Sequence, residues 1–210
     1  MSEYELYCFG ESGNSYKVAL MLTLCGAHWE PKPVDFFNGE SRSETYRSEI
    51  NEMGEVPVLV HDGRKLSQSG VMLDYLASNR GKFGWDNDDE RHDILRWMYF
   101  DNHKFTSYNA TLRFMLTFMK TGETPVTEFL RGRAEAAMQI VDKHLGAHDF
   151  MALDRLSIAD FSLIGYMFYD GELGVDLNDY PNILAWRERI SSQPGWKGPY
   201  DLMPRQAPAG

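Results

Sequence analysis

The sequence predicts a small α/β domain followed by an all-helical domain. Within the first 80 residues, short segments that alternate like strands are separated by stretches with helical spacing of apolar residues. From residue 88 onward only helical patterns recur. The intervening residues 81–87 combine glycines with acidic side chains and lack periodicity, as is typical of a linker. We therefore expect domains at residues 1–80 and 88–210, the first with strands of mixed direction.

The N-terminal domain begins with a strand and a helix. Residues 4–9 alternate in strand fashion, and a turn leads from them into a helix that ends at Gly26. The apolar residues of this helix recur at i, i+3, i+4 and i+7, which indicates one buried face; they are Val18, Met21, Leu22 and Cys25.

The remaining elements of this domain follow from proline and turn signals. Prolines in residues 28–36 suit an edge strand, and residues 43–51 predict a short polar helix. Residues 56–66 are two short strands joined at Asp62-Gly63, a strong hairpin signal. Helical spacing then continues from residue 68 to 81.

The second domain is predicted to contain four helices. Residues 88–120 form a long aromatic-rich stretch, and residues 134–145 carry a second apolar face. A capping box at residues 157–160 opens a third helix, and residues 182–191 form the last. We expect the Pro/Gly-rich tail after residue 193 to pack loosely.

Composition excludes several classes of partner. The chain has 21 basic and 31 acidic residues, which disfavours nucleic acid and anionic membranes. Its longest apolar stretch, residues 18–27, is shorter than the ~20 residues of a membrane-spanning helix. Two cysteines, Cys8 and Cys25, fit a reducing cytoplasm. Because no nucleotide or metal motif is present, we expect neither cofactor.

The turn in GESGNSYKVALML, residues 10–22, is the first candidate site. It places a glycine and short polar side chains between a strand and a helix. Such a turn holds a small anion or a sulfur atom against the free N–H groups of the helix, or it only caps the helix. The candidate side chains are Ser12, Asn14 and Ser15, and both readings remain open at this point.

Four stretches in this order carry a resemblance to a known family. They are SGNSYKV after the first strand, NEMGEVPVL before the hairpin, LSQSGVMLDYL at the third helix and SIADFSL in the helical domain. Together they resemble cytosolic glutathione transferases over the whole chain, above all the serine-type enzymes and their bacterial relatives. The resemblance implies a thioredoxin-like N-terminal domain, an all-helical C-terminal domain and a homodimer.

The resemblance implies that Ser12 is catalytic, as a hydrogen-bond donor to the glutathione thiolate. Lowering a thiol pKa from about 8.5 by two units requires ~2.7 kcal/mol. A hydrogen bond to a charged acceptor supplies roughly 1.5–3 kcal/mol, and a helix N-terminus adds about 0.3–1 kcal/mol. A serine at this helix start is therefore sufficient. Asn14 and then Ser15 are the alternatives if the turn is rotated by one residue.

Two further motifs are implied to bind glutathione. Pro57 resembles a proline held in a cis peptide, so that the backbone of Val56 pairs with the tripeptide; the alternative is an ordinary strand-entry proline. Gln68 and Ser69 begin a helix and offer donors to the α-carboxylate of the γ-glutamyl group. Helix capping alone would explain Ser69 but not Gln68.

Two residues depart from the family pattern. Met53 stands where relatives commonly have proline, and Glu55 where they have lysine or glutamine. An acidic residue removes an expected donor, so either glutathione binds more weakly or Arg42 meets the glycyl carboxylate instead. A solvated surface charge is the other reading of Arg42.

The resemblance also implies a second substrate pocket between the domains. Its candidates lie on the stretch WMYFDNHKFTSYNATLRFM, namely Tyr99, His103, Tyr108 and Phe114. The alternative is that these side chains belong to the core or to a subunit interface. His103 is an acid or base only if it faces the cleft.

The implied function is transfer of glutathione to a small hydrophobic electrophile, in detoxification. The same thiolate would also serve peroxide reduction, dehalogenation or isomerisation. The alternative from another class is a glutathione-binding or degenerate scaffold without turnover. The features that favour the scaffold are Met53 and Glu55. Those that favour the enzyme are Ser12, Pro57, Gln68 and Ser69.

Overall fold

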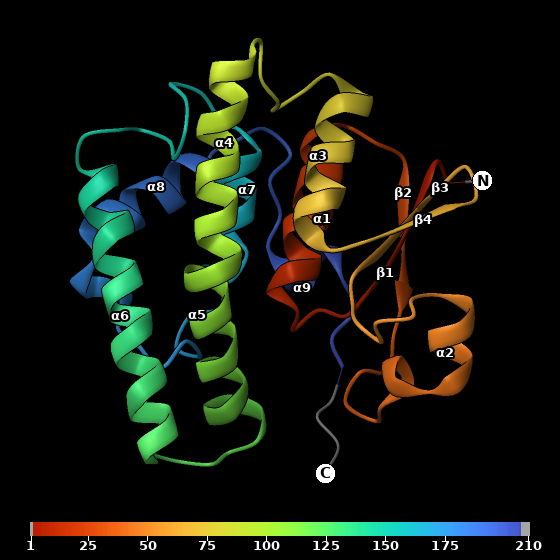
Figure 1. The fold of residues 1–210 in the computed structure, drawn as a ribbon, viewed down its shortest axis with the longest axis horizontal. Helices are drawn as coiled ribbons and strands as arrows, with labels where there is room; N and C mark the ends of the chain where they lie inside the picture. The colour runs from red at the N-terminus through yellow and green to blue at the C-terminus, as the bar shows by residue number, and fades with distance from the viewer. Residues whose placement is uncertain (1, 207–210) are drawn as a thin grey trace. The chain divides into compact units, whose positions relative to one another are not determined.

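The computed structural model describes residues 2–206, which divide into two compact units. The first unit contains the described residues up to Lys82 and those from Gln193 onward, and the second is Phe83–Ser192. Every strand of the described residues lies in the first unit, and the second is built from helices (Figure 1). The predicted combination of an α/β domain with an all-α domain is confirmed.

A four-stranded mixed sheet forms the centre of the first unit. Its strand order is β2-β1-β3-β4, with β2 parallel to β1 and the other neighbours antiparallel. The proline-bearing β2 lies at an edge, where missing N–H donors leave no gap in the ladder. The elements are β1 (Tyr4–Cys8), α1 (Gly13–Leu24), β2 (Trp29–Pro33), a 3₁₀ turn (Glu40–Arg42), α2 (Glu44–Glu49), β3 (Val58–His61), β4 (Arg64–Ser67), α3 (Ser69–Arg80) and α9 (Pro199–Leu202).

Helices α1 and α3 pack against each other and contact the sheet, and α9 contacts α1, while α2 lies apart from them (Figure 1). The side chains that they bury are mostly apolar, and burial of apolar surface is the main favourable term for this unit. Fully buried members of this core include Leu6, Val18, Leu22, Leu59 and Leu73. The core thereby fixes the turn that follows β1.

The C-terminal segment corrects the expectation of a loosely packed tail in the helical domain. Its described residues belong to the first unit. The carbonyl oxygen of Pro204 accepts a hydrogen bond from Gly10 N–H at 2.7 Å, and that of Lys197 accepts one from the Tyr16 hydroxyl at 2.9 Å. The backbone groups of the tail thus find partners at the N-terminal end of α1, which local composition does not reveal. Residues 207–210 lie outside the described residues.

The second unit differs from the prediction in its first helix. Residues 88–118 run as α4, a π-helical turn, α5 and a second π-helical turn rather than as one regular helix. Asp101 is buried in the first π-helical turn, and its carboxylate accepts hydrogen bonds from Thr106 and Ser162 at 2.7 Å each. The elements are α4 (Asp88–Phe100), π turn (Asp101–Phe105), α5 (Thr106–Arg113), π turn (Phe114–Phe118), α6 (Pro125–Leu145), α7 (Ile158–Ile164), 3₁₀ turn (Leu177–Asp179) and α8 (Pro181–Ser191).

The predicted capping box is present and opens α7. The carboxylate of Asp160 accepts hydrogen bonds from the backbone N–H groups of Ser157 at 2.9 Å and Met151 at 2.8 Å. The indole N–H of Trp186 donates to it at 2.9 Å. Complete burial raises the pKa of Asp160 to about 6, while these donors act to lower it. One side chain therefore joins α7, α8 and the preceding loop.

Candidate functional site

The turn after β1 is ordered by its own hydrogen bonds. Ser12 is the N-cap of α1, and its Oγ accepts a hydrogen bond from the Ser15 N–H at 3.1 Å. Only 6% of Ser12 is exposed. Capping uses a lone pair of the hydroxyl oxygen, so the hydroxyl proton stays available for donation. The capping and the catalytic readings of Ser12 are therefore compatible.

The three candidates of this turn have different surroundings. Asn14 is half-buried and lines a cavity of about 270 Å³. Ser15 is fully buried, and its hydroxyl has no hydrogen-bond partner among the described residues. Neither Ser12 nor Ser15 belongs to the cavity lining. Of the three, Asn14 is the side chain that the cavity exposes to a ligand.

Three segments of the first unit form this cavity. They are the N-terminal turn of α1, the loop before β3 and the start of α3. The lining residues are Asn14, Phe36, Gly54, Glu55, Val56, Pro57, Gln68 and Ser69. The structure thus brings together Asn14, the Val-Pro pair and the Gln-Ser pair, which lie far apart in the sequence.

The loop before β3 is anchored through Glu55. Its carbonyl oxygen accepts hydrogen bonds from the Asn51 side-chain amide at 3.0 Å and from the Tyr46 hydroxyl at 3.2 Å. The peptide bond between Val56 and Pro57 is cis, as expected. The side chain of Glu55 therefore extends from a backbone that two buried or partly buried side chains hold in place.

Gln68 has an unusual conformation at the start of α3. It is the N-cap, with φ of +67° and ψ of 113°, and its side chain does not cap the helix. Its Nε2 instead donates to Glu55 Oε2 at 2.8 Å and contacts Met53 Sδ at 3.4 Å. The first N–H groups of α3, beginning with Ser69, are consequently left without a side-chain cap from Gln68.

The structure places a second arginine near the cavity, besides the one that the sequence suggested. Arg42 and Arg47 are both exposed, and neither lines the cavity. Arg47 on α2 lies beside the cavity, because its guanidinium is 2.9 Å from the position that a Cβ on Gly54 would take. Gly54 has a φ of +68°, so a side chain there is excluded by conformation as well as by space.

The four residues suggested for the second substrate lie on the helices of the second unit. Tyr99 is 70% exposed on α4, and His103 is exposed in the first π-helical turn. Tyr108 is half-buried against Leu112, and Phe114 is half-buried in the second π-helical turn. None of the four lines the cavity beside Asn14. Their role in binding a substrate stays a prediction.

The chain's own thiols are poor nucleophiles. Cys8 and Cys25 are free and buried. Burial raises the pKa of Cys8 to about 12. Burial also raises the pKa of Cys25, although the positive charges of Lys82 and Arg80 act to lower it. Since the thiolate is the reactive form, a sulfur nucleophile at this site would have to come from the ligand.

Residues 2–206 show neither a metal-binding cluster nor a membrane-spanning helix. No group of three or more His, Cys, Asp or Glu side chains in this part of the chain is arranged to hold a metal ion. No helix there is long and apolar enough to cross a membrane.

Family models match both halves of the chain. Residues 2–78 match the glutathione S-transferase N-terminal domain, and residues 93–194 match the glutathione S-transferase C-terminal domain. A crystal structure of a "possible" glutathione S-transferase from Rhodopseudomonas palustris is 35% identical, covers 98% of this chain and 93% of its own, and has a TM-score of 0.88.

Curated relatives include two kinds of enzyme. Glutathione S-transferase F14 of Arabidopsis thaliana is 28% identical over 93% of this chain and 82% of its own length. Maleylacetoacetate isomerase of Rhizobium meliloti is 29% identical over 90% of this chain and 92% of its own. Solved structures with the same fold at 19 to 22% identity include several with bound glutathione. From the two domain matches and these relatives, the chain belongs to the glutathione S-transferase family of enzymes.

Proposed function

We propose that this protein binds glutathione in the cavity beside Asn14 and promotes attack of its thiolate on a small hydrophobic electrophile. The observation that carries the proposal is the lining of that cavity. Asn14, Val56, Pro57, Gln68 and Ser69 come from three separate motifs of the sequence and meet around one space of about 270 Å³.

The first catalytic requirement is a stabilised thiolate. The hydroxyl of Ser12 keeps a proton to donate, and the amide of Asn14 carries two N–H donors. Both lie at the N-terminus of α1, whose positive end favours a negative charge. We assign the thiolate donor to Ser12, with Asn14 as the second donor from the cavity wall. The buried Ser15 hydroxyl ranks third.

The second requirement is recognition of the tripeptide. The backbone of Val56 would pair with the peptide of glutathione, and the uncapped N–H groups at Ser69 would take the γ-glutamyl carboxylate. The guanidinium of Arg47 packs against Gly54, which belongs to the cavity lining. We therefore assign the glycyl carboxylate to Arg47.

The acceptor and the assembly belong to the same proposal. Tyr99, His103, Tyr108 and Phe114 would contribute to the electrophile site. We propose a homodimer, which is supported by exposed apolar side chains such as Val71 at 52% and Phe129 at 60%. A role in detoxification and a cytoplasmic location complete the proposal, and two free, buried cysteines fit a reducing compartment.

Isomerisation is the second candidate reaction, because one relative of similar identity is a maleylacetoacetate isomerase. Both reactions need the same stabilised thiolate and differ in the acceptor. A non-catalytic scaffold would bind glutathione without lowering the pKa of its thiol.

The test is calorimetric titration with glutathione, combined with ultraviolet detection of the bound thiolate as a function of pH. We expect binding with a depressed thiol pKa. The thiol pKa should rise in Ser12→Ala, and this variant should lose more turnover than affinity. In Ser12→Thr, which retains a hydroxyl, the thiol pKa should be as low as in the wild type. An unchanged pKa in Ser12→Ala together with a raised one in Asn14→Ala would transfer the role to Asn14. Absence of binding at millimolar glutathione would overturn the proposal.

A further inference from the structure

We propose that Glu55 selects ligands that carry a free α-ammonium group, by accepting a charged hydrogen bond from that group inside the cavity. This inference rests on the proposed function and names the part of the ligand that Glu55 recognises. Glu55 is then a specificity-determining residue of the glutathione site rather than a sign that the site is lost.

Hydrogen bonds to its backbone and to its side chain position Glu55. Hydrogen bonds from Asn51 and Tyr46 hold its carbonyl oxygen, and its side chain lines the cavity. Gln68 Nε2 donates to one carboxylate oxygen at 2.8 Å. Gln68 is thereby a positioning residue, since it directs the carboxylate toward the start of α3.

The carboxylate of Glu55 is not balanced by a cation. No lysine, arginine or histidine of the described part of the chain forms an ion pair with it, and its one side-chain donor, Gln68, is neutral. The nearby Arg47 packs against Gly54 and directs one guanidinium nitrogen to the carbonyl oxygen of Glu52 at 3.5 Å. Glu55 is exposed to solvent while lining the cavity, so its carboxylate is accessible to a cationic donor of the ligand and repels an anion.

The chemistry of glutathione decides which group can meet this acceptor. The tripeptide has two carboxylates and a single cation, the α-ammonium of its γ-glutamyl residue. The carboxylate on the same carbon suits the uncapped N–H groups that begin at Ser69. Gln68 precedes Ser69 in the chain and bonds to Glu55, so the two halves of the amino-acid headgroup find opposite charges side by side.

The experiment measures the affinities of two ligands on each variant by calorimetry at pH 7. The ligands are glutathione and glutaryl-cysteinylglycine, which has a hydrogen atom in place of the α-amino group. The variants are the wild type, Glu55→Gln and the matched control Glu52→Gln. The control removes the same charge from another exposed residue of the same loop, one that does not line the cavity. Each ratio compares two ligands on one protein, so a partial loss of folding cancels.

We expect the wild type and Glu52→Gln to bind glutathione about fivefold more tightly than the desamino ligand, as an ion pair with an exposed carboxylate implies. The ratio should fall toward one in Glu55→Gln. An unchanged ratio in Glu55→Gln would overturn the inference. Tighter glutathione binding by that variant would also overturn it and would place Glu55 near a ligand carboxylate. In both cases the proposed function would stand, whereas a wild type that binds neither ligand would overturn both.

Discussion

The backbone N–H of Gly10 donates a 2.7 Å hydrogen bond to the carbonyl oxygen of Pro204, which joins the two ends of the chain. Next to it, both carboxylate oxygens of Glu11 accept the backbone N–H of Gln206 at 3.0 Å. The C-terminal segment therefore holds the residues that directly precede Ser12. Its contribution is to orient the proposed thiolate donor.

A methyl group at Gly10 should disturb this contact. The Cβ of Gly10→Ala would lie 2.9 Å from the Pro204 oxygen and 3.0 Å from the ring of Tyr200. Relieving this overlap requires movement of backbone, so we expect a loss of about 1–3 kcal/mol in the free energy of unfolding. Urea denaturation measures the loss, and a steady-state assay should show a lower turnover.

The matched control is Gly132→Ala in the middle of α6, where a Cβ meets no other atom within 4 Å. Because alanine is favoured over glycine in a helix, this variant should gain about 0.5–1 kcal/mol. Equal stability of Gly10→Ala and the wild type would show that the C-terminal segment does not constrain the turn.

The native Gln68 should lower the stability of the protein and strengthen its binding of glutathione. Its φ of +67° with ψ of 113° is unfavourable for a residue with a Cβ. We expect Gln68→Gly to raise the free energy of unfolding by about 1 kcal/mol and to weaken glutathione binding, because the bond to Glu55 is lost. Thermal unfolding and calorimetry measure the two effects.

Gln68→Ala is the comparison, since it removes the same amide but keeps the Cβ. It should bind glutathione as weakly as the glycine variant without the gain in stability. A glycine variant that is less stable than the alanine variant would show that the native backbone carries no strain at this position.

Asp160 should be among the residues most important for stability in the second unit. Asp160→Ala leaves the buried N–H groups of Met151, Ser157 and Trp186 without their acceptor. At about 1–3 kcal/mol for each orphaned donor, the loss should exceed about 3 kcal/mol. Ser157→Ala removes only a cap hydroxyl and should cost about 1 kcal/mol by the same denaturation measurement. Similar losses in the two variants would argue against the network.

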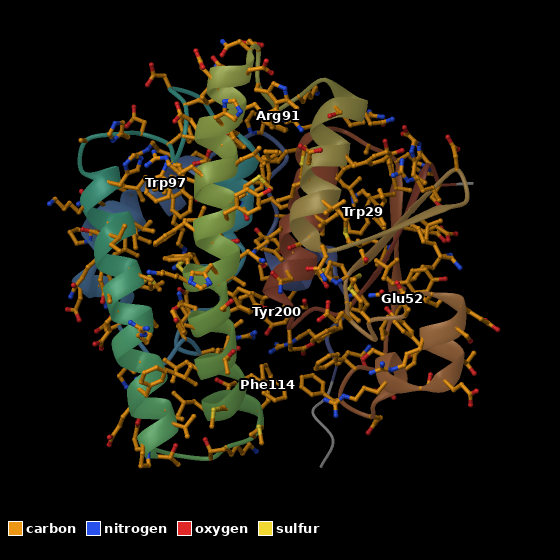
Figure 2. All side chains as sticks on the ribbon, in the orientation of Figure 1. Trp29, Glu52, Arg91, Trp97, Phe114 and Tyr200 are labelled. Atoms are coloured by element: carbon orange, nitrogen blue, oxygen red, sulfur yellow. The ribbon has the colours of Figure 1, made fainter. Side chains whose placement is uncertain are left out.

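His144 should make the second unit less stable in mild acid. Its ring stacks on that of His148, with the ring centroids 4.1 Å apart. The ring centroid of Trp97, which points from α4 toward α6, lies 4.5 Å from that of His144 (Figure 2). Burial lowers the pKa of His144, and the charges of His148 and Arg96 lower it further. The unfolded chain therefore binds a proton more readily than the folded one, so stability is present above pH 6.5 and is lost as the pH falls.

The measurement is the free energy of unfolding at pH 7.5 and at pH 5.5. The loss between them should be smaller in His144→Gln, which retains an N–H donor but does not titrate. His92→Gln, on the exposed face of α4, serves as the control and should retain the loss seen in the wild type. A loss in His144→Gln equal to that of the wild type would assign the pH dependence to other groups.

Local patterns in the sequence were sufficient for most of the secondary structure. Apolar periodicity identified α1 and α3, Asp62-Gly63 identified the β3–β4 hairpin, and the Ser-Ile-Ala-Asp box identified the start of α7. Prolines correctly placed β2 at the edge of the sheet. Interactions among residues close in the chain determine these features, so the local order and spacing of residues are enough to predict them.

The π-helical turns and the packed C-terminal segment could not be predicted in this way. The carboxylate of Asp101 accepts a hydrogen bond from the hydroxyl of Ser162 on α7. The backbone N–H of Gly10 donates one to the carbonyl oxygen of Pro204, which is distant in the sequence. Each contact depends on how distant segments fold against each other, and no periodicity reports it.

The same distinction holds for the candidate site. By itself, the sequence determined the family resemblance, the motifs around Ser12, Val56-Pro57 and Gln68, and the departure at Glu55. Only the tertiary structure decided that Asn14 lines the cavity, that the guanidinium of Arg47 packs against Gly54 in its lining, and that Gln68 bonds to Glu55. The physical reason is that side-chain partners are chosen by the packing of separate segments, which a linear pattern does not encode.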